Sequence, residues 1–451
     1  MRRLKRRALS DFQVIFKTWK APRERARSIY WIGLLAMAAH VAPAQPSSVH
    51  TYTWEQLRDE FRATNPTLQA ARVNIDESRA QEITAYLRPN PELTGTFDQM
   101  NFFAPQSPPS GNGGNSYSPF AYALPSGSIN YLHERGGKRE LRRDSAKQGT
   151  AISESQLADQ ERTLMFNLRN AFVQALQAKS VVGVARENLA YFDHVLEVSR
   201  ERFQAGDISK LDLDRLELQR VQFVSDVQTA TVNLRTAKIQ VLALLNDRAP
   251  VEQFDVNGPF DYKEQATPLT EFRQMALDTR PDLKAALQSV QKAETDHKLA
   301  VANGTTDPTF SIDLARNPPI PAYLGFSMTI PLRIFDKNQG EKLRTQLDIQ
   351  KNQRLRDAAE AQVFSDVDSA YATLESSLTL LRPYKTDYLK RAADVRETVS
   401  FAYQRGGVSL LDFLQAEQDY RSIQLSYLNL VGAYLTAASQ LNLAVGREVI
   451  Q

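Results

Sequence analysis

The sequence predicts a mainly α-helical protein with an internal two-fold repeat, long coiled-coil helices and four β-strands. Three observations support this prediction. A short turn motif occurs twice, so that Gly206 recurs as Gly406. Heptad patterns of apolar residues flank both copies, and two pairs of segments switch to the strand period of two. Each repeat therefore has the order helix, strand pair, long helix, turn, long helix.

The N-terminal 44 residues are predicted to be a secretory signal peptide. They hold ten Lys or Arg residues, then an apolar run at 29–39, then Ala42-Pro43-Ala44, which has the A-x-A form of a cleavage site. The apolar run is too short to cross a bilayer as a helix. A non-cleaved anchor is the alternative interpretation.

Removal of residues 1–44 reverses the sign of the net charge. Lys plus Arg falls from 55 to 45 and Asp plus Glu falls from 52 to 50, so the remaining chain is mildly acidic. The basic balance of the whole sequence therefore gives no support to a nucleic-acid partner. The sequence has no cysteine, which excludes disulfides, thiolate metal sites and a lipidated N-terminal cysteine.

The first repeat is expected at residues 45–250. A helical pattern at 53–88 is interrupted before Pro66, because proline suits the first turn of a new helix. A strand pair is expected at about 92–132, around a loop at 104–119 that is rich in proline and glycine. Two long helices follow, on either side of a turn at 203–213.

The second repeat is expected at residues 269–451, after a connector at 251–268 that contains two prolines. Its strand pair is placed at about 309–334 and its turn at 403–413. Pro383 lies in the long helix of this repeat, and Gly183 lies at the same place in the first. Both residues weaken a helix interior, so we expect a kink or break at both positions.

The long helices carry apolar residues at strict seven-residue spacing, which is typical of coiled coils. Two of these ladders are Leu168, Ala175, Val182, Leu189, Leu196 and Phe203, and Leu216, Phe223, Ala230, Ala237 and Leu244. A helix of about 65 residues is roughly 100 Å long, which suits a rod or the wall of a tunnel better than a compact domain.

Both turns contain residue types that are typical of helix caps. Gly206 and Gly406 can adopt the positive φ that ends a helix. A serine then stands at the N-cap of the next helix, and an aspartate follows three residues later, as in a capping box. These residues are Ser209 with Asp212, and Ser409 with Asp412.

Other candidate sites are weak, so we expect no catalytic site, no cofactor, no metal site and no enzymatic activity. The five histidines lack metal-ligand spacing. The basic cluster at 138–143 is interpreted as a membrane-interface or solvated helix face. Asp193, His194 and Ser199 lie along one helix without an orienting third group, so they form no triad.

The four strands impose an oligomer if they cross a membrane. Four strands cannot close a barrel, and a membrane barrel tolerates no open edge. Three chains would supply twelve strands. An oligomer is therefore a physical requirement of the membrane interpretation.

The sequence resembles the TolC-type outer-membrane efflux channels over essentially all of the chain after residue 44. The resemblance rests on the paired Gly-x-x-Ser-x-Leu-Asp turns, the Asn65-Pro66-Thr67-Leu68 start, and the two strand-to-helix joins. The second join, after Ile330-Pro331-Leu332, looks most like the heavy-metal branch of resistance-nodulation-division (RND) systems. The joins comprise Gly136, Gly137, Asp336, Asn338 and Gly340.

The resemblance implies a trimer with a twelve-stranded barrel in contact with outer-membrane lipid and an α-helical tunnel in the periplasm. It also implies docking of the turns to a periplasmic adaptor that is linked to an inner-membrane pump. The implied docking residues are Gly206, Ser209, Asp212, Gly406, Gly407 and Ser409. The implied pore constriction is Asp412 with Gln415, where some family members have two aspartates.

The leading hypothesis for function is a passive exit duct, in the outer membrane of a Gram-negative-type cell, for small molecules or metal ions. The energy would come from the inner-membrane partner. A type I protein-secretion duct and a non-pore periplasmic coiled-coil scaffold are the alternatives. A scaffold has no use for four alternating strands at matching places in two repeats.

Overall fold

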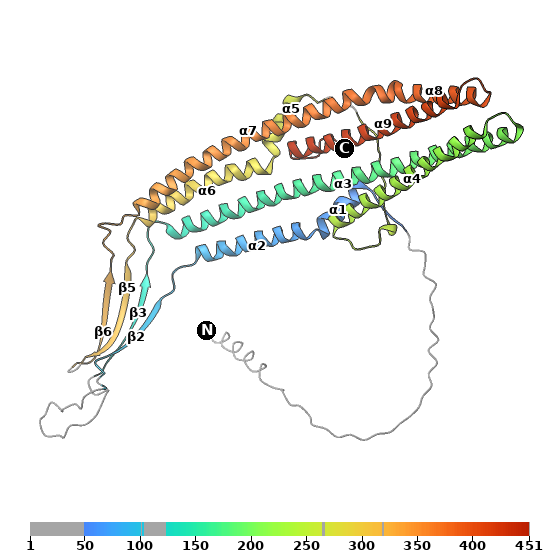
Figure 1. Ribbon diagram of the computed structural model, residues 1–451. Helices are drawn as coiled ribbons and strands as arrows, with labels where there is room; N and C mark the ends of the chain where they lie inside the picture. Colours follow the sequence, from blue (N-terminus) through green and yellow to red (C-terminus); the bar gives the residue numbers. More distant parts are fainter. Residues whose placement is uncertain (1–48, 101, 103–122, 264–266, 318–319, 451) are drawn as a thin grey trace, which may run out of the picture. The chain divides into compact units, whose positions relative to one another are not determined.

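The computed structural model describes residues 49–100, 102, 123–263, 267–317 and 320–450 (Figure 1). The expected signal peptide at 1–44 and the loop at 104–119 lie outside the described residues. Helices make up most of the described chain, and four of its strands form one sheet. The predicted fold class, mainly α with a smaller β part, is confirmed.

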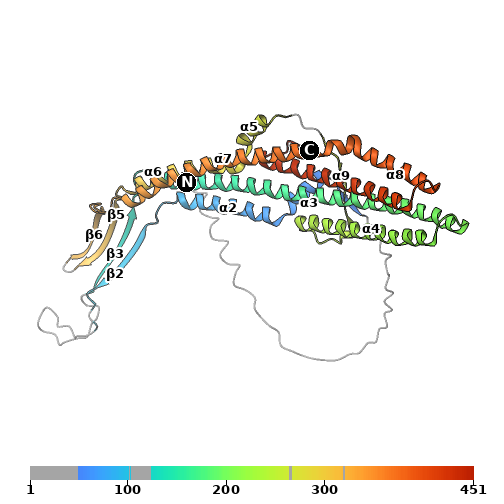
Figure 2. The same ribbon diagram turned by 45° about the horizontal axis from the view of Figure 1, so that its top comes forward.

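Four helices lie side by side next to the sheet. They are α2 (Pro66–Tyr86), α3 (Lys138–Ala205), α6 (Pro281–Asn303) and α7 (Gln339–Pro383). The contacts run in the order α2, α3, α6, α7 (Figures 1 and 2). Two helices of the first repeat are therefore followed by two helices of the second, and the repeats meet where α3 packs against α6.

The far end of α3 belongs to a second row of helices. It contains α4 (Lys210–Leu245), α8 (Leu389–Gln404) and α9 (Leu410–Val445). The contacts run in the order α4, α3, α9, α8. The α3–α4 turn and the α8–α9 turn therefore lie at the same end of the bundle (Figure 1).

The predicted heptad ladders form the seams between these helices. On α4, Leu216, Phe223, Ala230 and Ala237 are all buried. On α3, Leu168, Ala175, Val182 and Leu196 are buried as well. Sequence spacing therefore identifies much of the core.

In the first repeat, residues at the break between α1 (Trp54–Thr64) and α2 form hydrogen bonds with the C-terminal end of α4. Thr64, the last residue of α1, donates its hydroxyl to the carbonyl of Leu245 at 3.0 Å. The side-chain amide of Asn65 donates to the carbonyl of Leu244 at 3.2 Å. These bonds satisfy carbonyls at the C-terminus of α4 that have no partner within the helix.

The second repeat makes equivalent contacts with a different residue. Thr279, at the end of α5 (Leu269–Thr279), donates to the carbonyl of Val445 at 2.6 Å. The guanidinium of Arg280 donates to the carbonyl of Ala444 at 3.2 Å and to Asp366 at 2.8 Å. Arg280 thus takes the place that Asn65 has in the first repeat as donor to the end of a long helix. Unlike Asn65, it also forms an ion pair, with Asp366.

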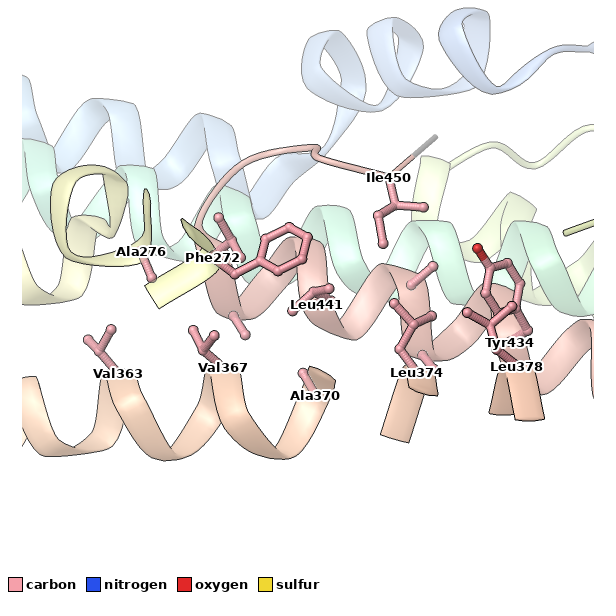
Figure 3. Packing of buried hydrophobic residues seen from close by; sticks show 14 of the residues in the cluster. Phe272, Ala276, Val363, Val367, Ala370, Leu374, Leu378, Tyr434, Leu441 and Ile450 are labelled. Carbon is pink, nitrogen blue, oxygen red and sulfur yellow. The ribbon is translucent and has the colours of Figure 1, made fainter. Parts of the chain in front are cut away.

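The largest core cluster of the second repeat joins α5, α7 and α9 (Figure 3). Phe272 of α5 lies close to Val367 of α7 and Leu441 of α9. Tyr434 is buried and donates its hydroxyl to the backbone carbonyl of Lys263 at 2.5 Å. The cluster therefore fixes the short helix α5 against two long ones.

The sheet is antiparallel throughout, with the strand order β2, β3, β5, β6. The bounds are Glu92–Asp98, Leu124–Leu132, Thr309–Asn317 and Ile320–Thr329. The register of β5 and β6 shifts between Ala315 and Asn317. One hairpin comes from each repeat, and β3 pairs with β5 at the centre, so the two repeats share one sheet.

The register places apolar and polar side chains on opposite faces of the sheet. Ile129 pairs with Ile312, which pairs with Phe326, and all three are exposed. On the other face, Ser311 donates its hydroxyl to the side-chain oxygen of Asn130 at 2.6 Å. The apolar residues of the first face include Leu93, Phe97, Phe310, Leu314, Leu324 and Met328. Exposure of such an apolar face to water is unfavourable, whereas contact with lipid is favourable.

A second, two-stranded sheet was not expected from the sequence. β1 (His50–Tyr52) pairs in parallel with β4 (Phe254–Val256), which lies inside the predicted connector at 251–268. Among the described helices, none combines the length and the apolar composition needed to cross a membrane.

The predicted matching break at Gly183 and Pro383 is only half right. After Pro383, the chain forms a π-helical turn, Tyr384–Tyr388, before α8 begins. In contrast, α3 continues without a break through Gly183. Proline lacks the amide hydrogen and clashes with the preceding turn, whereas glycine costs only about 1 kcal/mol in a helix.

A buried ion pair connects the sheet to the helices. The ammonium of Lys138, which is 4% exposed, lies 2.5 Å from Asp307 and 3.0 Å from the carbonyl of Thr305. Asp307 also accepts the backbone amide of Arg135 at 2.9 Å. The start of α3 and the start of β5 are thus held together by one carboxylate.

We predict that Asp307→Ala lowers the free energy of unfolding by about 3 kcal/mol, because a buried ammonium loses its counter-ion. The thermal midpoint of the protein purified in detergent, followed by circular dichroism, measures this effect. Glu252→Ala is the control, since its ion pair with Arg235 is about two-thirds exposed on both sides and contributes less than about 1 kcal/mol. Equal midpoints for the two variants would contradict the prediction.

Candidate functional site

The first turn closes α3 with a Schellman motif. Gly206 has a φ of 84°, and its amide donates to the carbonyl of Phe203 at 3.0 Å. The amide of Asp207 donates to the carbonyl of Arg202 at 2.8 Å. These two bonds define the motif. The motif requires a left-handed backbone at residue 206, which glycine adopts without strain.

The second turn has the same pair of bonds. Gly406 has a φ of 76°, and its amide donates to the carbonyl of Tyr403 at 3.0 Å. The amide of Gly407 donates to the carbonyl of Ala402 at 2.8 Å. Gly407 does not have a positive φ, so the backbone does not require glycine there. Its counterpart in the first turn is an aspartate.

The two N-caps differ in one hydrogen bond. Ser209 and Ser409 each accept the backbone amide of the aspartate three residues later. Only Asp412 returns a bond to the backbone amide of its serine, at 3.1 Å, and so completes a capping box. In the first turn, Arg215 lies 3.8 Å from Asp212 instead. The hydroxyl and then the amide of Ser409 lower the pKa of the Asp412 carboxyl.

The exposed face of α9 next to the turn is acidic, and the matching face of α4 is not. Asp412, Gln415 and Asp419 follow at intervals of three and four residues, and all three are exposed. Gln415 donates its side-chain amide to Asp419 at 2.8 Å. The corresponding residues of α4 are Asp212, Arg215 and Gln219. Our reading of the sequence missed Asp419, although helical spacing from Asp412 could have found it.

Aromatic rings from both repeats pack behind the turns. Phe192 of α3 stacks on Phe223 of α4, with ring centres 4.4 Å apart. Tyr403 of α8 stacks on Phe413 of α9 at 5.0 Å, and Phe413 also faces Phe192 at 6.5 Å. The two turns therefore share one core and are not independent loops.

The strand-to-helix joins also need left-handed residues. Gly136 and Gly137 have φ values of 71° and 66° before α3. A side chain at Gly136 would also press on the hydroxyl of Thr305. The first join is therefore restricted by both conformation and space.

At the second join, Asn338 takes the left-handed position that Gly137 takes in the first, with a φ of 60°. Its amide donates to Asp336 at 2.8 Å, and its side chain donates to the carbonyl of Ala300 at 2.7 Å. Gly340 has open space around it and a right-handed helical backbone, so nothing in the structure explains a glycine there.

Among the described residues, no group of three or more His, Asp or Glu side chains could hold a metal ion. The predicted site residues fall into two places instead. The turn and constriction residues lie at one end of the bundle, and the join residues lie at the sheet.

The model of the outer membrane efflux protein family matches residues 57–247 and 272–447, which include both rows of helices and all four strands of the larger sheet. The chain belongs to the outer membrane efflux protein family. The family resemblance predicted from the sequence is therefore confirmed.

Two relatives with assigned roles match most of the chain. The cobalt-zinc-cadmium resistance protein CzcC of Cupriavidus metallidurans is 23% identical over 394 residues, which cover 85% of this chain and 87% of CzcC. The pyoverdine export outer membrane protein OpmQ of Pseudomonas aeruginosa is 24% identical over 343 residues, which cover 71% and 69%. A heavy-metal relative agrees with the predicted branch of the family.

Solved structures share the fold at low identity. CusC superposes with a TM-score of 0.72 at 18% identity and covers 90% of this chain and 96% of its own. The CmeC channel of Campylobacter jejuni gives a TM-score of 0.70 at 14% identity, with coverage of 95% and 96%. As an outer membrane efflux protein, the chain is an outer-membrane duct that extends into the periplasm and serves a tripartite efflux system. The duct hypothesis is therefore confirmed over the non-pore scaffold.

A buried glutamate in this efflux protein was not recognised as unusual from the sequence. Glu417 is 2% exposed, and neither of its carboxylate oxygens accepts a hydrogen bond from a described residue. Burial raises the pKa of Glu417 to about 7, although Arg396 and Arg421 attract its negative charge. Its counterpart Glu217 is exposed and pairs with Arg200 at 2.8 Å.

The two arginines near Glu417 are committed to other groups. Arg396 lies over the rings of Tyr191 and Tyr420, at 4.2 and 3.9 Å from their centres. Arg421 bonds to Asp226 at 2.9 Å. Glu417 therefore has positive charges nearby but no direct partner, which explains why burial dominates.

We predict that Gly406→Ala loosens the second turn by about 1 kcal/mol, because alanine is strained at a φ of 76°. Amide exchange in the peptide 400–413 should become roughly fivefold faster. Gly407→Ala is the matched control, since its new methyl group would meet the carbonyl of Ala402 at an ordinary 3.5 Å. The prediction fails if both variants exchange alike.

We predict that Glu417→Gln removes a pH dependence of stability. A carboxyl whose pKa rises from 4.5 to about 7 on folding binds a proton more tightly in the folded state. The wild type should therefore lose on the order of 3 kcal/mol between about pH 4.5 and pH 7 through this group. At pH 8 the glutamine variant should have the higher thermal midpoint.

The control for this experiment is Glu217→Gln, which changes the exposed counterpart in the first repeat. Midpoints are compared with the wild type at pH 5 and pH 8. A difference between Glu417→Gln and the wild type that does not change with pH would refute the assignment.

Proposed function

We propose that three copies of this chain close into one duct. Members of the family work as trimers with periplasmic adaptors and inner-membrane pumps. In the described part of this chain, α2 and α4 lie at one edge of the two rows, and α7 and α8 lie at the other. These edges carry exposed apolar residues that a neighbouring copy would cover: Leu218, Val221, Val232, Leu343, Leu347, Leu355, Val395 and Phe401.

The sheet supports the same proposal. β2 and β6 each pair with one strand in the described part of the chain, so each has an edge without a partner. Long unpaired edges invite pairing with another chain. Sheets from three copies would supply the twelve strands of a closed barrel, with the apolar face that includes Ile129 and Ile312 in contact with lipid.

The two turns are proposed to dock a periplasmic adaptor. They lie at the end of the bundle that is far from the sheet, and their shared aromatic core holds both in one position. The second turn is the proposed constriction, because α9 carries Asp412 and Asp419 where α4 carries Asp212 and Gln219. Transport through the duct is passive and requires no catalysis by this chain.

The substrate is proposed to be a divalent transition-metal cation. CzcC matches 85% of this chain, and its name assigns cobalt, zinc and cadmium resistance to it. The exposed carboxylates of Asp412 and Asp419 would attract cations to the periplasmic end. The observation that carries the proposal is this acidic face next to the second turn.

A second candidate is a small organic molecule such as a siderophore. OpmQ matches 71% of this chain, and its name assigns pyoverdine export to it. A duct that touches its cargo weakly can serve either class, because selection then occurs in the pump. A protein-secretion duct has no such relative to support it among the proteins described above.

The proposal predicts that cells with the cognate adaptor and pump retain zinc, cobalt or cadmium when this chain is deleted. Metal content is measured by mass spectrometry after exposure to each metal. Asp412→Asn combined with Asp419→Asn should slow export at least about threefold while trimers still form, because the local cation concentration falls. Asp278→Asn, an exposed aspartate on α5, is the control.

Unchanged metal content after deletion would contradict the metal proposal. If the same cells then accumulate a siderophore, the second candidate replaces it. Loss of trimers in the double variant would show that the two aspartates act in assembly rather than in conduction.

A further inference from the structure

A cavity of about 470 Å³ lies between α1, α3 and the C-terminal end of α9. It is separate from the turns, the joins and the sheet, and the proposed duct function does not use it. Ligand pockets in proteins commonly have volumes of about 300 to 1,000 Å³. The cavity is therefore large enough for a small organic molecule.

The cavity is lined by more positive than negative charge. Five arginines and two glutamates contribute to its wall, namely Arg58, Arg62, Arg162, Arg169, Arg447, Glu161 and Glu448. Three of the arginines have carboxylate partners. Arg62 bonds to Glu161 at 2.7 Å, Arg162 bonds to Asp159 at 2.5 Å, and Arg58 lies 3.3 Å from Asp59.

The other two arginines have no carboxylate within 4 Å in the described part of the chain. The guanidinium of Arg169 lies 4.5 Å from the centre of the Trp54 ring and 5.9 Å from that of Phe172. Arg447 donates to the sulfur of Met275 at 2.7 Å, which is a weak acceptor. Both cations therefore retain donors that an anion could use.

The position of Arg169 is costly without an anion. Burial lowers the pKa of Arg169, and the attraction of Glu448 and Glu55 does not offset that effect. Stacking on Trp54 returns only about 1 kcal/mol. A guanidinium that is partly removed from water gains most from a carboxylate or phosphate, which accepts two parallel hydrogen bonds from it.

Apolar side chains form the rest of the wall. Trp54, Met165, Phe166 and Leu443 line the cavity together with the arginines. The indole nitrogen of Trp54 donates to Glu448 at 3.0 Å, which fixes the ring in place. The wall thus offers an aromatic surface beside two cations.

We propose that this cavity binds a small organic anion. Its carboxylate or phosphate group is held by Arg169 and Arg447, and its apolar part packs against Trp54 and Phe166. The site gives this efflux protein a binding function at α1 and the end of α9, separate from the turns and the sheet.

Trp54 makes the proposal directly measurable. The sequence has three tryptophans, Trp19, Trp31 and Trp54, so Trp19→Phe with Trp31→Phe leaves Trp54 as the single fluorescent reporter whether or not residues 1–44 are removed. The probes are phenyl phosphate, inorganic phosphate and benzyl alcohol, each added to the purified full-length protein in detergent at constant ionic strength. Together they separate the contribution of the anion from that of the apolar part.

Phenyl phosphate should change the emission of Trp54 with a saturating curve. Inorganic phosphate should need a concentration about tenfold higher or more, and benzyl alcohol should have no saturating effect. Benzoate in place of phenyl phosphate then identifies whether a carboxylate or a phosphate is preferred. A curve that sodium chloride alone reproduces would overturn the proposal.

The decisive variant is Arg169→Gln, which should raise the half-saturating concentration of phenyl phosphate about tenfold or more, because a charge-assisted hydrogen bond is lost. Arg235→Gln is the control, since Arg235 is an exposed arginine on α4 in an ion pair elsewhere. Circular dichroism establishes that each variant is folded, and Arg447→Gln replaces Arg169→Gln if the latter is not. Unchanged half-saturation in the folded variant would overturn the proposal.

Discussion

Burial along narrow heptad seams is the constraint on which the rest of this structure depends. The helix α4 packs mainly on α3, so one stripe of α4, which includes Leu216, Phe223 and Ala230, must supply most of its packing. The C-terminal ends of α4 and α9 are stabilised separately, by hydrogen bonds from Thr64 and Thr279. The same constraint leaves apolar stripes exposed at both edges of the rows, and these stripes favour assembly with further copies.

Features that depend on local sequence were predicted well. The turns at Gly206 and Gly406, the serine N-caps and the four long strands follow from spacing and backbone chemistry alone. Features that depend on distant residues were not predicted. β1 and β4 are three residues long and pair across some 200 residues, and Glu417 of α9 is buried near groups that include Tyr191 of α3 in the first repeat. The error at Gly183 arose because equal position in the repeats was taken as equal structure.

The two repeats share a backbone plan but differ in chemistry. Asn65 caps with an amide where Arg280 forms an ion pair with Asp366. The second turn has a complete capping box, an acidic exposed face and a buried glutamate behind it, whereas the first has Arg215 and an exposed Glu217. The repeated sequence thus determines the shared architecture. The capping box, the acidic face and the buried glutamate occur at the second turn alone.

The pairing of β3 with β5 has a consequence for the order of folding. The two strands come from different repeats, and α3, α4, α5 and α6 lie between them along the chain. Closing so long a loop is entropically costly until the intervening helices have packed. Each hairpin can form locally, but the sheet becomes continuous only when both halves of the chain are present. Synthesis from the N-terminus therefore leaves the first hairpin with an open edge until the second hairpin has been made.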